Sequence, residues 1–416
     1  MQSTKQTNGI AARTGSPLGI YAKSITPPPS AGEVRAKLQG IRAERYVLLS
    51  AARRVFSAAG RRSGLQYGHD YHRTAKCKFI RVAHQVGVHQ SKAHGSAFFS
   101  KLFTCGNVWT CPVCAAKVQE RRRVEIAKAI DWAYASGLQP VMVTLTFPHR
   151  TWDKVGRLLD QQATALQRLR AGKPWERFKE RYGYQGLIRS LEITHGANGW
   201  HPHTHELWFV HKDADADQMH LDILKRWESA CSRAGLLDLA DPRQLAAFRL
   251  HAVDVKGNCS ASDYLAKQDD AKNWGVDREI AKASTKAGRA KGLHAFGLLA
   301  KAADGDTRSA RLYLAYSIAM RGRRQIYWSR GLKDRVGLLD VTDEVLAEEK
   351  QDSADLLGQL SAEDWQTVRD AGARAQVLDA AERGGWPEIE TLLERLTLSE
   401  ISRLETLLYS ASLPCV

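Results

Sequence analysis

A run of alternating histidines, HPHTH at 201–205, constrains this 416-residue chain more than any other feature of its sequence. The run continues directly into the apolar letters LWFV, which predicts an extended strand over 201–211. Side chains alternate along a strand, so His203 and His205 project from one face, about 6–7 Å apart. His201 has the same parity, although the proline that follows it can tilt it away. Imidazoles placed in this way can converge on one cation.

A second strand is predicted just before the histidines, over 186–196, and the turn-rich letters HGANGW join the two strands into a β-hairpin. Glu192 on this second strand supplies a carboxylate across the hairpin. Two imidazoles and a carboxylate leave positions open for a substrate oxygen, as a catalytic divalent metal requires. The alternative interpretation is three surface histidines on an edge strand, but the apolar continuation of the strand favours the metal site.

The neighbouring segments predict an α+β fold. Strands are expected over 140–149, 186–196, 201–211 and 248–255, and helices after the first strand, over 215–234 and from about Ser260. The order strand, helix, strand, strand, helix, strand is the split βαβ arrangement. This order favours an antiparallel sheet with helices on one face.

Four of the seven cysteines gather ahead of these strands, at Cys77, Cys105, Cys111 and Cys114. The last two form a CxxC, whose spacing lets two thiolates reach one tetrahedral metal, and the first two can complete the ligand set. The sequence therefore predicts a structural zinc site. A redox CxxC, plain buried thiols, and a histidine in place of Cys77 are the alternatives. The histidines near enough in sequence are His69, His72, His84, His89 and His94.

Charge is distributed unevenly along the chain. The formal net charge is +16, yet residues 335–416 hold 7 Lys+Arg against 17 Asp+Glu, which leaves the preceding part at +26. A basic body with an acidic end is typical of a nucleic-acid-binding protein. The sequence has no run of about eighteen apolar residues and no apolar core of a secretory signal near its start. We therefore expect a cytoplasmic protein with no membrane partner.

Three motifs in a fixed order resemble those of a known family. They are VTLT at 143–146, HPHTH at 201–205, and a downstream Tyr-x-x-Lys formed by Tyr264 and Lys267. The chain resembles the rolling-circle replication initiators of the HUH endonuclease superfamily, most closely the plasmid Rep branch with a cysteine-rich segment ahead of its first motif. The resemblance covers about residues 77–332.

The resemblance implies that Tyr264 attacks a DNA phosphate and becomes linked to its 5′ end. Lys267 lies one helical turn further on and adds a positive charge near the reacting groups. The implied ligands of a catalytic Mg²⁺ or Mn²⁺ are His203, His205, Glu192 and His201. A Tyr-x-x-Lys motif alone is ordinarily a core tyrosine with a solvated lysine. Only its place after the histidine strand favours a nucleophilic role for Tyr264.

One position departs from the family pattern. Some members place a glutamate four residues before the tyrosine to activate water, whereas this chain has Ser260. Asp263 would point elsewhere on a helix, so the candidates for that step are Asp269, Asp270, a second protein molecule or another residue. The tyrosines of RLYLAYSIAM (311–320) have helical spacing and are expected in the core.

Basic segments at 282–292 and 321–333, the second with Tyr327 and Trp328 interleaved, are typical of single-strand binding, and a solvated basic surface is the alternative. The expected DNA contacts are Arg121, Arg122, Arg289, Lys291, Arg323, Arg324 and Trp328. The expected parts of the chain are a flexible leader (1–30), a helical basic region (31–76), a zinc-binding segment with a helix (77–135), a nicking domain (136–275), a basic DNA-binding extension (276–334) and an acidic helical region (335–416).

These features together predict a metal-dependent, site-specific nickase and joining enzyme that starts rolling-circle replication of a plasmid or similar element. Its expected partners are origin DNA, as a single strand or as a cruciform or hairpin, together with a host helicase and replication proteins. A conjugative relaxase or single-tyrosine transposase is the alternative within the same chemistry. A non-enzymatic zinc-containing DNA-binding regulator is the alternative from another class.

Overall fold

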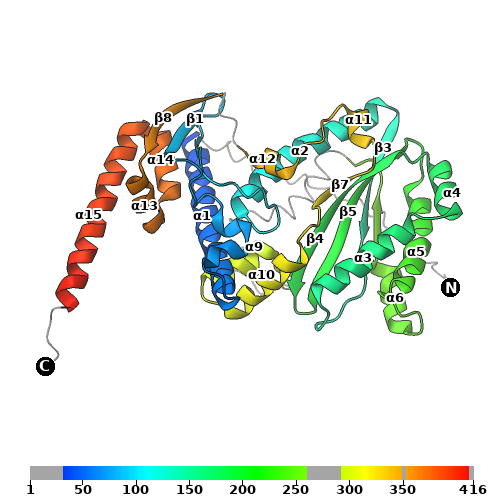
Figure 1. Ribbon diagram of the computed structural model, residues 1–416. Coiled ribbons are helices and arrows are strands. Elements are labelled where there is room, and N and C mark those ends of the chain that lie inside the picture. Colours follow the sequence, from blue (N-terminus) through cyan, green and yellow to red (C-terminus); the bar gives the residue numbers. More distant parts are fainter. Residues whose placement is uncertain (1–30, 260–291, 349–352, 412–416) are drawn as a thin grey trace, which may run out of the picture. The chain divides into compact units, whose positions relative to one another are not determined.

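The computed structural model describes residues 31–259, 292–348 and 353–411. The chain divides into two units, residues 1–38 and 39–416, and every contact given below lies within the second. The described part is a mixed α and β structure with two antiparallel sheets (Figure 1). No helix within the described ranges combines the length and the apolar character needed to cross a bilayer.

The larger sheet has the strand order β6-β3-β5-β4-β7. Its strands are β3 (Leu138–Leu145), β4 (Gly186–Gly196), β5 (Gly199–His211), β6 (Val253–Lys256) and β7 (Ile326–Trp328). Every neighbouring pair is antiparallel, so β3 and β4 run parallel with β5 between them, and β5 and β6 run parallel with β3 between them. The predicted split βαβ order is therefore confirmed.

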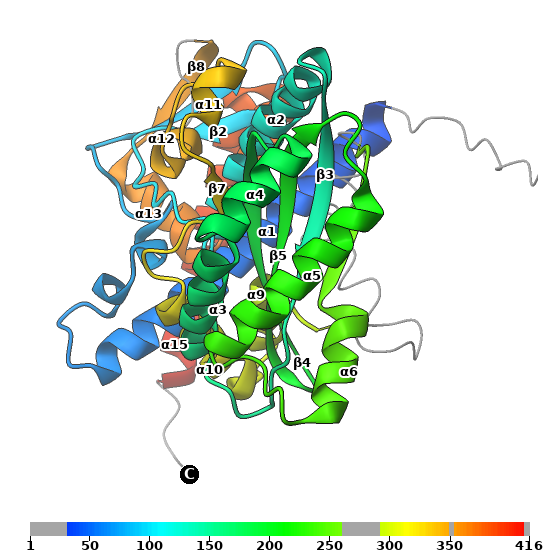
Figure 2. The same ribbon diagram turned by 90° about the vertical axis from the view of Figure 1, so that its right-hand side faces the viewer.

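Helices form the first two crossovers of this sheet. They are α3 (Val155–Leu169) and α4 (Lys173–Tyr182) between β3 and β4, and α5 (Ala216–Arg233) and α6 (Pro242–His251) between β5 and β6. Figure 2 shows α3, α4 and α5 in front of the strands. The strand predicted over 248–255 is wrong in its first half, because α6 continues to His251. Asp241 starts that helix by accepting hydrogen bonds from the N–H groups of Arg243 and Gln244.

The sheet is covered on both faces, not on one as the sequence predicted. Trp208 and Val210 of β5 belong to the core shared with α3 and α5. Leu207 and Phe209, of opposite parity, pack with α2 (Pro112–Ala135) and with Leu332 at the start of α11 (Leu332–Val336). The continuous apolar run of β5 is the reason, since a strand buried on both faces needs apolar side chains of both parities.

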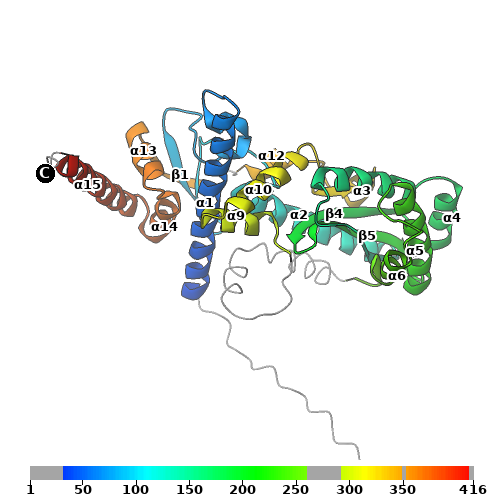
Figure 3. The same ribbon diagram turned by 90° about the horizontal axis from the view of Figure 1, so that it is seen from below.

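The smaller sheet joins distant parts of the chain in the order β2-β1-β8. It consists of β1 (Val86–Ser91), β2 (Ala97–Phe99) and β8 (Ala354–Leu360). The acidic C-terminal region is thus not entirely helical, because β8 lies within it. Its helices are α12 (Asp343–Ala347), α13 (Ala362–Asp370), α14 (Arg374–Gly384) and α15 (Trp386–Ala411). Figures 1 and 3 show α13 and α14 beside β1.

Ion pairs and a hydrogen bond join α14 to α1 (Ala31–Arg62). Arg42 Nη1 lies 2.7 Å from Asp379 Oδ1, and its other terminal nitrogen contacts Glu382. Arg374 of α14, almost fully buried, donates to Ser50 Oγ at 2.6 Å. The acidic charge of this region is therefore partly neutralised by arginines of the chain itself.

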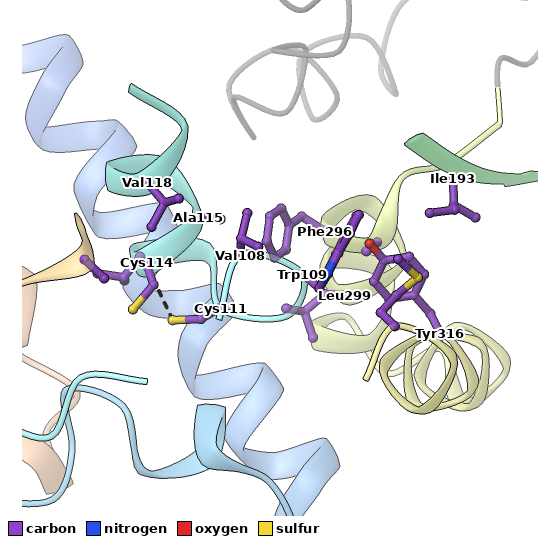
Figure 4. Close-up of a cluster of buried hydrophobic side chains, with 14 of the residues drawn as sticks. Val108, Trp109, Cys111, Cys114, Ala115, Val118, Ile193, Phe296, Leu299 and Tyr316 are labelled. Atoms are coloured by element: carbon purple, nitrogen blue, oxygen red, sulfur yellow. Dashed lines mark hydrogen bonds between the residues drawn. The ribbon is translucent and has the colours of Figure 1, made fainter. Parts of the chain in front are cut away.

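Two further helices, α9 (Ala295–Ala303) and α10 (Thr307–Ala319), lie between β6 and β7 in the chain. Tyr313 and Tyr316 of α10 are 0% and 1% exposed, which confirms that they belong to the core. The Tyr313 hydroxyl donates to the carbonyl of Thr110 at 2.6 Å. Figure 4 shows Tyr316 in one buried cluster with Trp109 and Phe296, which extends towards the cysteines at the start of α2.

Candidate metal centres and nucleic-acid surface

Glu192, His203 and His205 meet on one face of the larger sheet. The hairpin register places Glu192 of β4 directly opposite His203 of β5. Glu192 Oε2 lies 3.1 Å from His203 Nε2 and 3.2 Å from His205 Nε2, and the carboxylate residue is only 8% exposed. The donor atoms all lie within 4.8 Å of one another, so these three residues form a group that could hold a metal ion.

A fourth residue, His294, completes this cluster. The backbone groups of Leu293 and His195 exchange two hydrogen bonds of 2.8 Å, so the chain after residue 291 lies along the edge of β4. His294 follows at the N-cap of α9, and its Nε2 lies 3.2 Å from Glu192 Oε1. The sequence does not predict the role of His294, because a single histidine ahead of a helix has no spacing that relates it to a distant strand.

Electrostatics keep Glu192 ionised. Burial alone would raise the pKa of Glu192, but hydrogen bonds from His203 and His205 outweigh it and hold that pKa well below its usual range. Burial lowers the pKa of His294, which favours the neutral imidazole that a metal or a carboxylate partner can use. An ionised carboxylate among imidazoles is a donor set that fits a divalent cation.

His201 shares the strand but makes different contacts. Its Nδ1 lies 2.8 Å from His149 Nε2, and its Nε2 lies 3.5 Å from Thr146 Oγ1. Its ring centroid is 5.0 Å from that of His203. Burial, followed by the charge of His203, lowers the pKa of His201 to about 4. His201 therefore lies beside the Glu192 cluster as a neutral imidazole, bonded to the loop after β3.

Thr144 of β3 supports the histidine face. Thr144 lies opposite His205 in the register, and its Oγ1 is 3.1 Å from His205 Nδ1. This contact fixes the ring so that Nε2 points towards Glu192. Partners on the second ring nitrogen set both the orientation and the tautomer of a ligating histidine.

The four cysteines also meet. Cys77, Cys105, Cys111 and Cys114 are buried free thiols whose sulfur atoms all lie within 4.8 Å of one another, so they could hold a metal ion. Four sulfur donors in a closed, buried set are typical of a structural zinc or an iron–sulfur centre. The cluster needs no histidine to complete a tetrahedral set.

Local backbone structure aims the sulfur atoms inward. Cys111 is the N-cap of α2 and accepts from the N–H of Cys114 at 3.4 Å (Figure 4). Cys105 Sγ accepts from the N–H of Asn107 at 3.4 Å, across Gly106 with its φ of +63°. Burial raises the pKa of Cys111 and Cys105 when no cation is present. A bound cation would lower these pKa values instead, since metals bind the deprotonated thiolates.

Of the proposed DNA contacts in the described ranges, most line one cavity. Its volume is about 770 Å³, and its walls come from the loop after Cys105, the end of α10, β7 and the start of α12. Arg122, Arg323, Arg324 and Trp328 line it. Arg121 does not line this cavity and donates to the carbonyl of Glu348 at 3.3 Å.

Two of these arginines already have acidic partners. Arg122 Nη1 lies 2.9 Å from Glu125 Oε2, and Arg122 Nη2 lies 2.8 Å from Asp343 Oδ1. Arg323 Nη2 lies 2.6 Å from Asp160 Oδ1. Arg324 is exposed. Tyr264, Lys267, Arg289 and Lys291 lie outside the described residues, as do Ser260 and the other candidates for the water-activating step.

Comparison with known families identifies the family of this chain, and two curated proteins are similar to it. A family model described as "Replication protein" matches residues 99–371. A "Protein rep" from Streptomyces lividans is 27% identical over 306 residues, which are 59% of this chain and 66% of that protein. A "Neomycin resistance protein" from Streptomyces cyanogenus is 30% identical over 192 residues, which are 38% of this chain and 44% of that protein. No solved structure matches.

Proposed function

This chain belongs to the replication protein family, and we propose that it starts rolling-circle replication by cutting and rejoining one DNA strand at the origin of a plasmid or similar element. Its fold is then that of an HUH endonuclease. The observation that carries the proposal is the ionised Glu192 held between His203, His205 and His294 on one face of a split βαβ sheet.

The cluster suits a phosphate-cleaving centre. Glu192, His203 and His205 would hold Mg²⁺ or Mn²⁺, with His201 next to them on the same strand. A divalent ion bound there would polarise the scissile phosphate and stabilise charge on its oxygens. The protein's own contribution is orientation, because Thr144 fixes the ring of His205 and His294 contacts the carboxylate.

Tyr264 is the proposed nucleophile. Its oxygen would attack the phosphorus and lose its proton, while the bond from phosphorus to the 3′ oxygen breaks and that oxygen takes up a proton. The products are a 5′-phosphotyrosine and a free 3′ hydroxyl, so the energy of the broken bond is kept for rejoining. Lys267 would stabilise the phenolate or the phosphate, since a free tyrosine has a pKa near 10.

The attachment of the preceding chain supports this role for Tyr264. The N–H of Cys259 donates to the carbonyl of Pro140 on β3 at 2.9 Å, and Tyr134 of α2 donates to the carbonyl of Cys259 at 3.0 Å. Five residues of extended chain span at most about 18 Å. The described chain that precedes Tyr264 thus ends at a fixed point beside β3, the strand next to the histidines.

The expected contacts with DNA and with partner proteins follow from this proposal. The cysteine cluster would bind Zn²⁺ and hold the loop after Cys105 against the cavity lined by Arg324 and Trp328, where origin DNA would lie. Arg289 and Lys291 would extend this surface. Extension of the free 3′ hydroxyl requires a polymerase and strand separation, so a host helicase and replication proteins are the expected partners.

The test is covalent capture. The full-length protein is incubated with Mn²⁺ and labelled single strands that tile the origin region of the element encoding it, and adducts are separated under denaturing conditions. The proposal expects an adduct with the wild type and none with Tyr264→Phe. An adduct that persists in Tyr264→Phe would overturn the nucleophile, and binding without any adduct would favour the non-enzymatic regulator.

A further inference from the structure

Trp152 is the exposed tryptophan of the described residues. It is 73% exposed in the loop between β3 and α3, whereas the other tryptophans of the described ranges are buried or half-buried. A single exposed apolar side chain is ordinary on a protein surface. The surroundings of Trp152 are what make it informative.

Trp152 borders a cavity of about 500 Å³. Arg150 and Arg157 also line it, and the guanidinium carbon of Arg150 lies 5.6 Å from the ring centroid of Trp152. Asp153, Asp238, Gln161 and Gln244 are also among its lining residues. Both glutamines have backbone partners, because Gln161 Nε2 donates to the carbonyls of Ala234 and Gly235, and Gln244 Oε1 accepts from the N–H of Asp238. A cavity of this volume is within the range that holds small ligands, and an aromatic ring with arginines in the same cavity suits a base with its phosphates.

The loop that presents Trp152 is fixed in place. The N–H of Arg150 donates to Asp153 Oδ2 at 2.7 Å, and the N–H of Asp153 donates back to the carbonyl of Arg150 at 3.1 Å. Gly199 packs so closely that an added Cβ would lie 2.9 Å from the Arg150 carbonyl oxygen and the Thr151 Cα. The ring therefore extends from a rigid turn, which lowers the entropy lost when a ligand binds.

The same loop is bonded to the histidine strand. His149 places Nε2 2.8 Å from His201 Nδ1 and Nδ1 3.0 Å from the carbonyl of Asn198. His201 in turn lies next to His203, with 5.0 Å between ring centroids. The imidazoles of His149 and His201 therefore link the Trp152 loop to the Glu192 cluster.

We propose that the Trp152 cavity is a subsite for single-stranded DNA, in which one base of the strand that passes the Glu192 cluster stacks on Trp152 while Arg150 and Arg157 contact flanking phosphates. The inference rests on the proposed function, because it places this base on the strand that is cut. Stacking on an exposed ring requires an unpaired base, so the occupant is a single strand and not a duplex.

The test measures binding without cleavage. Full-length Tyr264→Phe protein is titrated into fluorescein-labelled oligothymidylate, without Mg²⁺ or Mn²⁺, and followed by fluorescence anisotropy. Trp152→Ala in this background should weaken binding roughly 5- to 150-fold, the range for loss of one stacked base. Trp152→Phe should retain most of the affinity. Leu250→Ala, which removes an apolar side chain that is 74% exposed, is the matched control.

An abasic oligomer of the same length and charge separates stacking from general charge attraction. It should bind the parent protein more weakly than oligothymidylate does, and Trp152→Ala should reduce that difference. Equal affinity of Trp152→Ala and its parent for oligothymidylate overturns the subsite, as does an equal loss for both oligomers. If Trp152→Ala weakens binding while the wild type forms no origin adduct, the subsite stands and the nicking proposal fails. If the wild type forms the adduct while Trp152→Ala binds as its parent does, only the subsite is overturned.

Discussion

His294 Nε2 lies 3.2 Å from Glu192 Oε1, while the other carboxylate oxygen faces His203 and His205 at 3.1 and 3.2 Å. The carboxylate thus has imidazole partners on both oxygens, and its plane is fixed from two elements, β5 and the N-cap of α9. We infer that His294 is a positioning residue that holds Glu192 in the orientation a cation would meet.

His294→Ala should weaken Mn²⁺ binding about 10- to 100-fold, the usual cost of losing a residue that orients a ligand. Isothermal titration calorimetry measures this affinity directly, without any DNA. His211→Ala, an exposed histidine at the far end of β5, provides the control and should leave the affinity unchanged. Unaltered Mn²⁺ affinity in His294→Ala would show that β4 and β5 orient Glu192 without help from His294.

The sequence predicted the local part of this site and missed the long-range part. Strand alternation placed His203 and His205 on one face, and the hairpin predicted that Glu192 would face them, because both relations depend on near neighbours in the chain. His294 reaches the cluster through the bridge between Leu293 and His195, which no periodicity encodes.

In the fold, too, the sequence predicts the local features and not the long-range ones. The split βαβ order follows from local strand and helix patterns, and it was predicted. Pairing of β8 with β1 was not, since it joins residues 354–360 to residues 86–91 and depends on tertiary packing. The second helical face was also missed: α2 precedes the first strand of the sheet and only the folded chain brings it against Leu207 and Phe209.

His72 should make the protein less stable in mild acid. Its Nδ1 accepts from the N–H of Thr74 at 3.2 Å, and its ring stacks on Phe56. Burial, followed by the charges of Arg321 and Arg73, lowers the pKa of His72 to about 4. Between that value and about 6.5 the unfolded chain binds a proton that the folded chain does not, so stability falls as the pH falls.

For this one group the loss between pH 7 and pH 5 is about 2 kcal/mol. His72→Asn keeps a side-chain acceptor for the Thr74 N–H but does not titrate, so its unfolding free energy should change less with pH. Urea unfolding at both pH values, with wild type and variant side by side, gives the difference. Parallel pH profiles would contradict a half-buried, neutral His72.

Cys111→Ser should remove the metal of the cysteine cluster. The protein as purified is expected to contain one zinc per chain in this cluster, and losing one of four thiolates from a closed site opens its coordination. Elemental analysis should show less than one equivalent of zinc in the variant, and the melting temperature should fall. Cys231→Ser, a change at a buried cysteine outside the cluster, should retain the zinc. Retention of a full equivalent by Cys111→Ser would exclude this residue as a ligand.

Arg324 should contribute to DNA binding through charge alone. It is exposed in the cavity next to Trp328, whereas Arg323 in the same cavity is paired with Asp160 at 2.6 Å. A phosphate contact releases about one counterion, so Arg324→Ala should lower the slope of log affinity against log salt by about one and weaken all sequences similarly. Anisotropy with oligothymidylate across a salt series measures both quantities. Arg181→Ala removes the same charge from α4, where Arg181 is paired with Asp222, and should leave the slope as in the wild type. If the two variants lower the slope equally, the loss reflects the net charge of the protein and Arg324 makes no phosphate contact of its own.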